Sequence, residues 1–449
     1  MRDLVMLLVL PFMVYAIMKR PFIGVALWLW TALFNPNGWV YGIAGSIRYN
    51  LLFAILTFIS YMFYKDKIKF KWDKLSSLIF IFTIISVLST IFTIGNFEIA
   101  WEYQIRFLKT IALFFMIITV FKNKLHIDTL IWVIALSTCF YGCVEGLKFI
   151  ASGGGHKIAG MKGHALADNN ELALAFTIFI PLIIYLGFEY GKKSTLIKFG
   201  SIGMIILLVV SVLGTNSRGG LIALLVVIGY FFLISSGKIK LYAVLALSLL
   251  LPLIFSLLPE EWFLRMNTIE NATEDSSFMG RVIAWKIATL IAIEHPFLGG
   301  GIKAIENHSV WLYMSTYFDN LSYIPTPEPD LGRGYASHSI YFQVLSETGF
   351  LGLFIFLYIL KTAFNKLSKI ILFAKNNHDE NYTWVLSLGK MLRVSLVAYC
   401  IGGAALNFAY FEGIYAIFAI IYVLEHRVIS KDINVEMDDR IVRRELRYV

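Results

Sequence analysis

Residues 51–94 read LLFAILTFISYMFYKDKIKFKWDKLSSLIFIFTIISVLSTIFTI, and this stretch decides the fold class. Two apolar runs, 51–64 and 75–94, flank a short polar segment. The second run has the length of about 20 residues that the hydrocarbon core of a bilayer requires, and short lysine-rich connections mark the cytoplasmic side of a membrane protein. The pattern therefore predicts two membrane-spanning helices joined by a cytoplasmic loop. The lysines of that loop are Lys65, Lys67, Lys69, Lys71 and Lys74.

The composition extends this interpretation to the whole chain. Its 449 residues are 58% hydrophobic and 15% charged, with a mean hydropathy of +0.72. Soluble domains are roughly half apolar and about a quarter charged, so these values indicate a polytopic membrane protein. The net charge of +9 comes largely with lysines in short loops, which argues against a nucleic-acid partner. Cys139, Cys143 and Cys400 fall inside apolar runs and predict no disulfide framework.

Apolar runs and basic loops alternate along the rest of the chain, and every lysine-rich loop falls on one side if the N-terminus is outside. The first two runs are short, so they form either two spans or a re-entrant hairpin. We expect an all-α bundle of about 12–13 transmembrane helices. About ten lie in 1–258, the others lie in 338–425, and 426–449 is a cytoplasmic tail. The expected spans are 4–18, 21–34, 51–64, 75–94, 107–121, 130–150, 172–188, 199–213, 221–234, 241–258, 340–360, 386–406 and 414–424.

The segment 259–337 is a long polar interruption in this pattern, and loops held by a rigid scaffold commonly carry functional sites. The alternation places it on the outer face of the membrane, together with the polar loops 151–170 and 214–219. That face has no ATP, and the sequence has no phosphate-binding P-loop. Any reaction there needs a substrate that carries its own activation. Within the segment, 280–294 is expected to form an amphipathic helix along the membrane surface.

Two arginines on the outer face are candidates for binding phosphate. Arg218 lies in a tight turn followed by two glycines, and Arg281 lies in the first turn of the expected amphipathic helix. A guanidinium group binds phosphate oxygens through two parallel hydrogen bonds. The alternatives are a helix-end anchor for Arg218 and a lipid headgroup contact for Arg281. Arg265 and Trp285 in the same segment are further candidates for substrate binding.

His338 precedes the span 340–360 and is a candidate general base, because a neutral imidazole accepts a proton near pH 7. The alternative is a boundary histidine satisfied by water. Gln343 and Glu347 follow on the same span and are expected to line the same crevice. His295 and His308 lack the spacing of a metal site, so no metal and no cofactor are expected.

The sequence Asp168-Asn169-Asn170-Glu171 precedes the span 172–188. Asp168 as N-cap and Glu171 three residues later match a capping box. This accounts for the two acidic residues and leaves Asn169 and Asn170 for hydrogen bonding to a sugar. Asp168 is included with them as a possible substrate-binding residue.

Four stretches stand in a characteristic order along the chain: DNNELALA at 168–175, SRGG at 217–220, GRxxxW at 280–285 with HPxxGxG at 295–301, and HSxYxQxxxExGxxG at 338–352. Together they resemble the O-antigen ligase and polymerase superfamily of bacterial inner membranes. The Asp168-Asn169-Asn170-Glu171 block and the Met1-Arg2-Asp3 start with Asn35-Pro36 resemble most closely a branch called O-glycosylation ligases associated with exosortase systems. The resemblance covers roughly residues 1–425, and the order and spacing of the motifs carry it.

The resemblance implies transfer of a glycan from undecaprenyl pyrophosphate to an acceptor hydroxyl on the periplasmic face of a Gram-negative inner membrane. Enzymes of this kind need no metal or nucleotide. Carried over by motif, Arg218 and Arg281 hold the pyrophosphate and His338 activates the acceptor. The acceptor stays open between lipid A core, a protein Ser or Thr, and another glycan. A polymerase with the same donor is the main alternative, and a transporter or flippase is a weaker one.

Overall fold

The computed structural model describes residues 2–161, 163–238, 240–241, 276–377 and 379–429, with a few positions between 244 and 263. All regular secondary structure in these residues is helical, and seven helices are long and apolar enough to cross a membrane. The prediction of an all-α polytopic membrane protein is confirmed.

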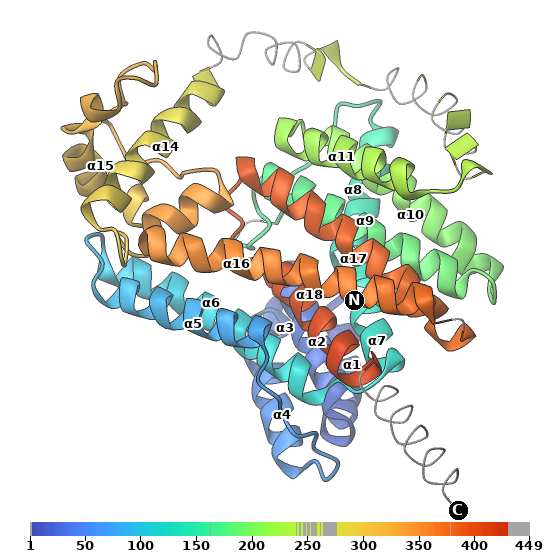
Figure 1. Cartoon of the computed structure of the whole chain (residues 1–449). Helices are drawn as coiled ribbons and strands as arrows, with labels where there is room; N and C mark the ends of the chain where they lie inside the picture. Colours follow the sequence, from blue (N-terminus) through green and yellow to red (C-terminus); the bar gives the residue numbers. More distant parts are fainter. Residues whose placement is uncertain are drawn as a thin grey trace, which may run out of the picture.

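Each expected span except one coincides with a helix of the bundle (Figure 1). The exception, 241–258, lies mostly outside the described residues. The helices are α1 Arg2–Lys19, α2 Pro21–Phe34, α3 Gly42–Ser46, α4 Tyr49–Phe63, α5 Lys74–Ile91, α6 Phe97–Val120, α7 Lys124–Ile134, α8 Phe140–Ala151, α9 Asn169–Tyr190, α10 Thr195–Gly214, α11 Arg218–Ile234, α14 Ser276–Glu294, α15 His308–Ser315, α16 Ile340–Asn376, α17 Thr383–Gly402 and α18 Glu412–Val423.

Polar residues just before the apolar runs define where several of these helices begin. The Asp73 carboxylate accepts a hydrogen bond from the Ser76 amide at the start of α5, and the Ser76 hydroxyl completes a capping box. Asn96 caps α6 and Ser217 caps α11 in the same way. These side chains satisfy amide groups that a helix start leaves without a partner, which is costly at a membrane boundary.

Helix α9 forms the centre of the bundle. It packs against α10, α11 and α17, and 78% of its apolar 18-residue stretch is buried inside the protein. Small residues permit this close packing: a Cβ atom on Gly220 of α11 would lie 2.5 Å from the Cβ of Ala173. The glycine pair after Arg218 therefore brings the start of α11 against the start of α9.

Helix α16 has 37 residues and would span about 55 Å, more than a bilayer core requires. It is kinked at Gly349, whose φ is +71°. The carbonyls of Ser346 and Glu347 accept hydrogen bonds from the amides of Gly300 and Gly301, at 2.8 and 3.1 Å. The glycine run therefore supplies hydrogen bonds at the kink. A Cβ on Gly349 would lie 2.6 Å from the Pro296 carbonyl oxygen, and a Cβ on Gly299 would lie 2.5 Å from the Gly349 nitrogen. This close approach of the two backbones requires glycine at both positions.

Helices α14 and α15 lie together at one side of the bundle, next to the start of α16 (Figure 1). The expected amphipathic helix is present and ends at Glu294, but it begins at Ser276 rather than at residue 280. Its apolar stripe packs inside the protein. Ile283, Ile287 and Ile291 pack with Trp311 and Met314 of α15 in a separate hydrophobic core. The stripe that was expected to face the membrane surface is therefore covered by α15.

Candidate active site

His338 adopts a left-handed backbone conformation, with φ of +45°. This conformation costs a non-glycine residue roughly 1–2 kcal/mol and persists only where neighbouring contacts impose it. Asn407 supplies contacts on both sides: its Oδ1 accepts hydrogen bonds from the Ser337 hydroxyl at 2.8 Å and from the Ser339 amide at 3.3 Å. The indole of Trp285 donates a third bond to the Ser337 carbonyl, at 2.8 Å. The histidine is therefore held at a fixed place before α16.

Two cavities meet at this histidine. The first, here named the α14 cavity, has a volume of about 520 Å³ and is lined by Arg281, Asn170 and Tyr335 among others. The second, named the α6 cavity, has about 370 Å³ and lies among α6, the start of α9 and the segment 406–412. His338 and Ala336 line both. The segment that carries the histidine thus forms a wall shared by the two cavities.

The electrostatic surroundings keep the His338 imidazole neutral. Its exposed edge is reached by solvent, but desolvation by the cavity walls lowers its pKa below the usual 6.5. The positive charge of Arg281 lowers the pKa further, while the carboxylates of Asp168 and Glu306 oppose the shift. A neutral imidazole at pH 7 is the form that accepts a proton from a hydroxyl.

Arg281 and His338 are brought together in the α14 cavity. Arg218 is half-buried at the first position of α11 and lines neither cavity. The Asn169 amide donates a hydrogen bond of 2.7 Å to the Thr215 carbonyl, in the turn that leads into Arg218. The start of α11 is thereby tied to the start of α9, where Asn170 reaches the α14 cavity. Arg265 lies outside the described residues.

The start of α9 only partly follows the expected capping box. Asp168 is the N-cap, since its carboxylate accepts hydrogen bonds from the backbone and side-chain amides of Asn170 at 2.8 and 3.0 Å. Glu171 does not return the bond expected of a capping box. Its carboxyl group lines the α6 cavity and makes no hydrogen bond or ion pair with another described residue. Both asparagines have protein partners, so they hold the loop in addition to any contact with a sugar.

Gln343 and Glu347 differ in their access to the site. Gln343 lines the α6 cavity and accepts a hydrogen bond from the Ala409 amide. Glu347 is 2% exposed, and its carboxylate accepts bonds from the Lys303 amide at 3.1 Å and the Tyr410 hydroxyl at 2.6 Å. Glu347 therefore joins three segments behind the site, and it does not line either cavity.

Trp285 is engaged with the protein through both its face and its edge. Its ring stacks on Phe342 with centroids 5.1 Å apart, and its N–H is bonded to Ser337. These contacts place the side chain behind the His338 segment. They give Trp285 a positioning role, which the sequence did not suggest.

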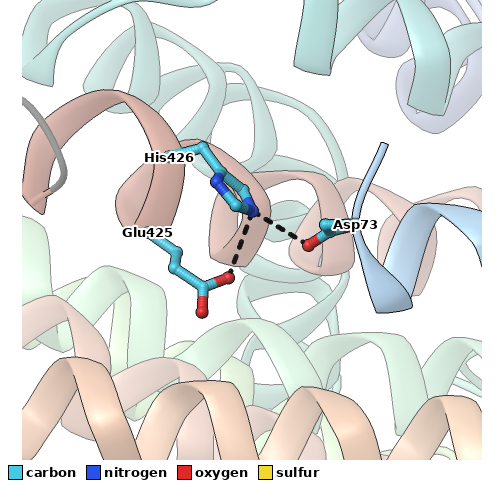
Figure 2. A group of neighbouring side chains, drawn as sticks. All are labelled: Asp73, Glu425 and His426. Carbon is cyan, nitrogen blue, oxygen red and sulfur yellow. Dashed lines mark hydrogen bonds and ion pairs between the residues drawn. The ribbon is translucent and has the colours of Figure 1, made fainter. Parts of the chain in front are cut away.

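A group of acidic and histidine side chains lies at the far end of α16, and Figure 2 shows its geometry. His426 Nε2 is 3.0 Å from Asp73 and 3.4 Å from Glu425. Lys366 of α16 lies 2.7 Å from Asp73 and also pairs with Glu425. Lys366 and His426 each contact both carboxylates, so the group forms an ion-pair network. It joins the start of α5, the end of α16 and the segment after α18.

Residues 203–357 match the O-antigen ligase family. Residues 1–191 match a family of unknown function, DUF5935. No curated protein matches the sequence. The ligase match contains Arg218, Arg281 and His338, and it supports a membrane glycan ligase or polymerase in general.

Sequence reasoning missed Asn407, Lys303 and the free carboxyl group of Glu171. Asn407 lies in a short segment between two apolar runs, where an asparagine is an ordinary turn residue. Lys303 lines the α6 cavity and has a left-handed backbone, and its ammonium group lies 2.6 Å from Glu306. The long-range contacts of Asn407 have no local signature.

Proposed function

We propose that the protein transfers a glycan from a polyprenyl pyrophosphate donor to an acceptor hydroxyl, with His338 as general base. One observation supports this most strongly: His338 and Arg281 line the same cavity inside the region that matches the O-antigen ligase family. The cavity volume of about 520 Å³ is within the usual range for small-ligand sites.

Each residue has a separate task in the proposed reaction. The guanidinium group of Arg281 binds the pyrophosphate oxygens in the α14 cavity and stabilises the charge that develops as the leaving group departs. Arg218 lines neither cavity in this structure, and its proposed role in binding the pyrophosphate rests on the motif that it belongs to. The neutral imidazole of His338 removes the proton of the acceptor hydroxyl. The acceptor oxygen forms a bond to the anomeric carbon while the bond from that carbon to the pyrophosphate oxygen breaks. The donor carries its own activation, so no nucleotide is required.

We also propose an orientation of the protein in the membrane and a branch of the family to which it belongs. The alternation of lysine-rich loops supports an inner-membrane protein with α14, α15 and His338 on the periplasmic face. Undecaprenyl pyrophosphate is the donor expected there. The sequence resembles the exosortase-associated branch of O-glycosylation ligases, and we propose that the protein belongs to that branch.

Replacing each arginine with lysine tests this assignment, because lysine keeps the charge and loses the two-pronged hydrogen bonding. Arg218→Lys and Arg281→Lys are expected to insert normally and lose most transfer. Arg333→Lys is a matched control, since Arg333 is exposed in the same segment and lines neither cavity. Wild-type transfer in both variants would reduce the two arginines to structural anchors.

A polymerase is the second candidate, because it uses the same donor and the family match does not separate the two. Glycan analysis of a deletion strain distinguishes them. Loss of attachment with long chains intact indicates a ligase, whereas accumulation of single repeat units indicates a polymerase.

A further inference from the structure

The wall shared by the two cavities has a consequence for where the acceptor binds. In a direct displacement, the acceptor oxygen approaches the anomeric carbon from the side opposite the departing pyrophosphate. The general base must reach that oxygen, so it lies between the donor site and the acceptor site. His338 occupies such a position, since it lines both the α14 cavity and the α6 cavity.

The two cationic side chains that line the α6 cavity, Lys303 and Arg106, are each paired with a carboxylate. The Lys303 ammonium group lies 2.6 Å from Glu306, and Arg106 lies 2.5 Å from Glu102. Asp168 is occupied in capping α9. A pyrophosphate would have to break such pairs to gain a cationic partner. The cavity therefore suits an uncharged ligand better than an anionic one.

Groups that suit a sugar remain available in the same cavity. The carboxyl group of Glu171 has no hydrogen-bond partner among the described residues and is suited to binding a hydroxyl. The rings of Tyr103, Phe107 and Phe411 line the wall. Aromatic rings cover the apolar face of a pyranose while polar groups bind its edge, so the lining matches a carbohydrate.

We propose that the α6 cavity binds the acceptor, that the acceptor is a sugar, and that Glu171 hydrogen-bonds one of its hydroxyl groups. This inference rests on the proposed function and assigns the donor pyrophosphate to the α14 cavity. A second sugar hydroxyl faces His338 and loses its proton to the imidazole. Its oxygen then bonds to the anomeric carbon, and the pyrophosphate leaves with the electron pair of the broken bond toward Arg281.

Cysteine labelling separates the two cavities without knowledge of the acceptor. In a background with Cys139, Cys143 and Cys400 changed to alanine, three single cysteines are introduced and treated with a bulky membrane-impermeant maleimide. Ala165→Cys lies in the α6 cavity and Gly280→Cys in the α14 cavity, where an added Cβ meets open space. Asn320→Cys is an exposed control that lines neither. Each unlabelled variant controls for folding.

Two readouts are compared: binding of radiolabelled undecaprenyl pyrophosphate to purified protein, and new glycan attachment in cells. Labelled Ala165→Cys is expected to lose transfer at least tenfold and to keep donor binding, while labelled Gly280→Cys loses both. Loss of donor binding in labelled Ala165→Cys, or unchanged transfer, overturns the assignment. Failure of the unmodified protein to bind undecaprenyl pyrophosphate contradicts the proposed function itself.

A substitution and a product analysis complete the test. Glu171→Gln is expected to reduce transfer about fivefold with donor binding unchanged, the effect of one weakened hydrogen bond. Glu189→Gln at the other end of α9 is the control. Release of the attached glycan by mild alkaline β-elimination would identify a Ser or Thr acceptor and overturn the assignment of a sugar.

Discussion

The indole nitrogen of Trp285 donates a hydrogen bond of 2.8 Å to the carbonyl oxygen of Ser337, the residue before His338. This bond connects α14, which carries Arg281, to the segment that carries the candidate base. The Trp285 ring also stacks on Phe342 in the first turns of α16. The spacing between the arginine and the histidine thus depends on a side chain four residues after the arginine.

Trp285→Phe tests this positioning role, because phenylalanine keeps the stacking and removes the N–H donor. Loss of one hydrogen bond is expected to lower kcat about 2- to 10-fold, with KM for the donor nearly unchanged. Steady-state kinetics on purified protein measures both values, and Trp101→Phe near the start of α6 is the control. A change in donor KM alone would make Trp285 a substrate contact.

Asn407 acts through a single oxygen atom, which allows a rescue experiment. Asn407→Ala removes the acceptor shared by Ser337 and Ser339 and is expected to reduce kcat at least tenfold as His338 loses its fixed backbone conformation. Asn407→Asp keeps an acceptor oxygen at the same place and should retain most activity. Equal loss in both variants would show that activity depends on the amide nitrogen of Asn407 rather than on the two hydrogen bonds to its Oδ1 atom.

The pH dependence of transfer reports on Arg281. Desolvation and the Arg281 charge lower the pKa of His338, so the active neutral form persists to lower pH than for a free imidazole. Arg281→Gln removes the positive charge and is expected to move the acidic limb of the kcat/KM profile to higher pH. Lys361→Gln, at a distant position on α16, should leave it in place. An unmoved limb in Arg281→Gln would mean that another group controls the profile.

Hydropathy and lysine placement were sufficient to predict the helices, because the bilayer imposes length and charge rules that act locally on sequence. The kink at Gly349 was not predicted from them, since α16 reads as one apolar run followed by lysines. The same limit applies to Lys366, which looks like a loop residue and is instead a buried member of a helix.

The candidate site was predictable where a residue acts through its own chemistry. Arg281 and His338 were named as candidates because they belong to short motifs beside polar segments, and the structure places both in the lining of one cavity. Asn407 and the α6 cavity were not predictable. Asn407 contacts Ser337, 70 residues earlier in sequence, and the cavity is lined by residues that range from Tyr103 to Glu412. Glu171 was misassigned because the capping-box pattern does not reveal which way the carboxyl group turns.

The ion-pair network at the other end of α16 is expected to stabilise the bundle. Lys366→Met leaves Asp73 and Glu425 close together without their shared cation and should lower the apparent Tm in detergent by several degrees. Lys369→Met, exposed one turn later, is the matched control. An unchanged Tm in Lys366→Met would show that the network contributes nothing.

The same network gives a dependence of stability on pH. Burial favours a higher pKa for Asp73, but hydrogen bonds from His426 and Lys366 outweigh it and hold the pKa well below its usual range. A depressed folded-state pKa gives stability that is fully present above the unfolded value of about 3.9 and is lost as pH falls toward the folded value. Asp73→Asn should therefore flatten the acid side of a plot of Tm against pH.

The most direct test of the central claim is the turnover of His338→Gln with a lipid-linked donor in a purified assay. A positioned base contributes about 10²- to 10⁴-fold, and glutamine cannot accept the proton. The account predicts donor binding within about twofold of wild type and turnover reduced by at least about a hundredfold. Weakened donor binding with unchanged turnover at saturation would contradict it, because His338 would then be a substrate contact rather than the base.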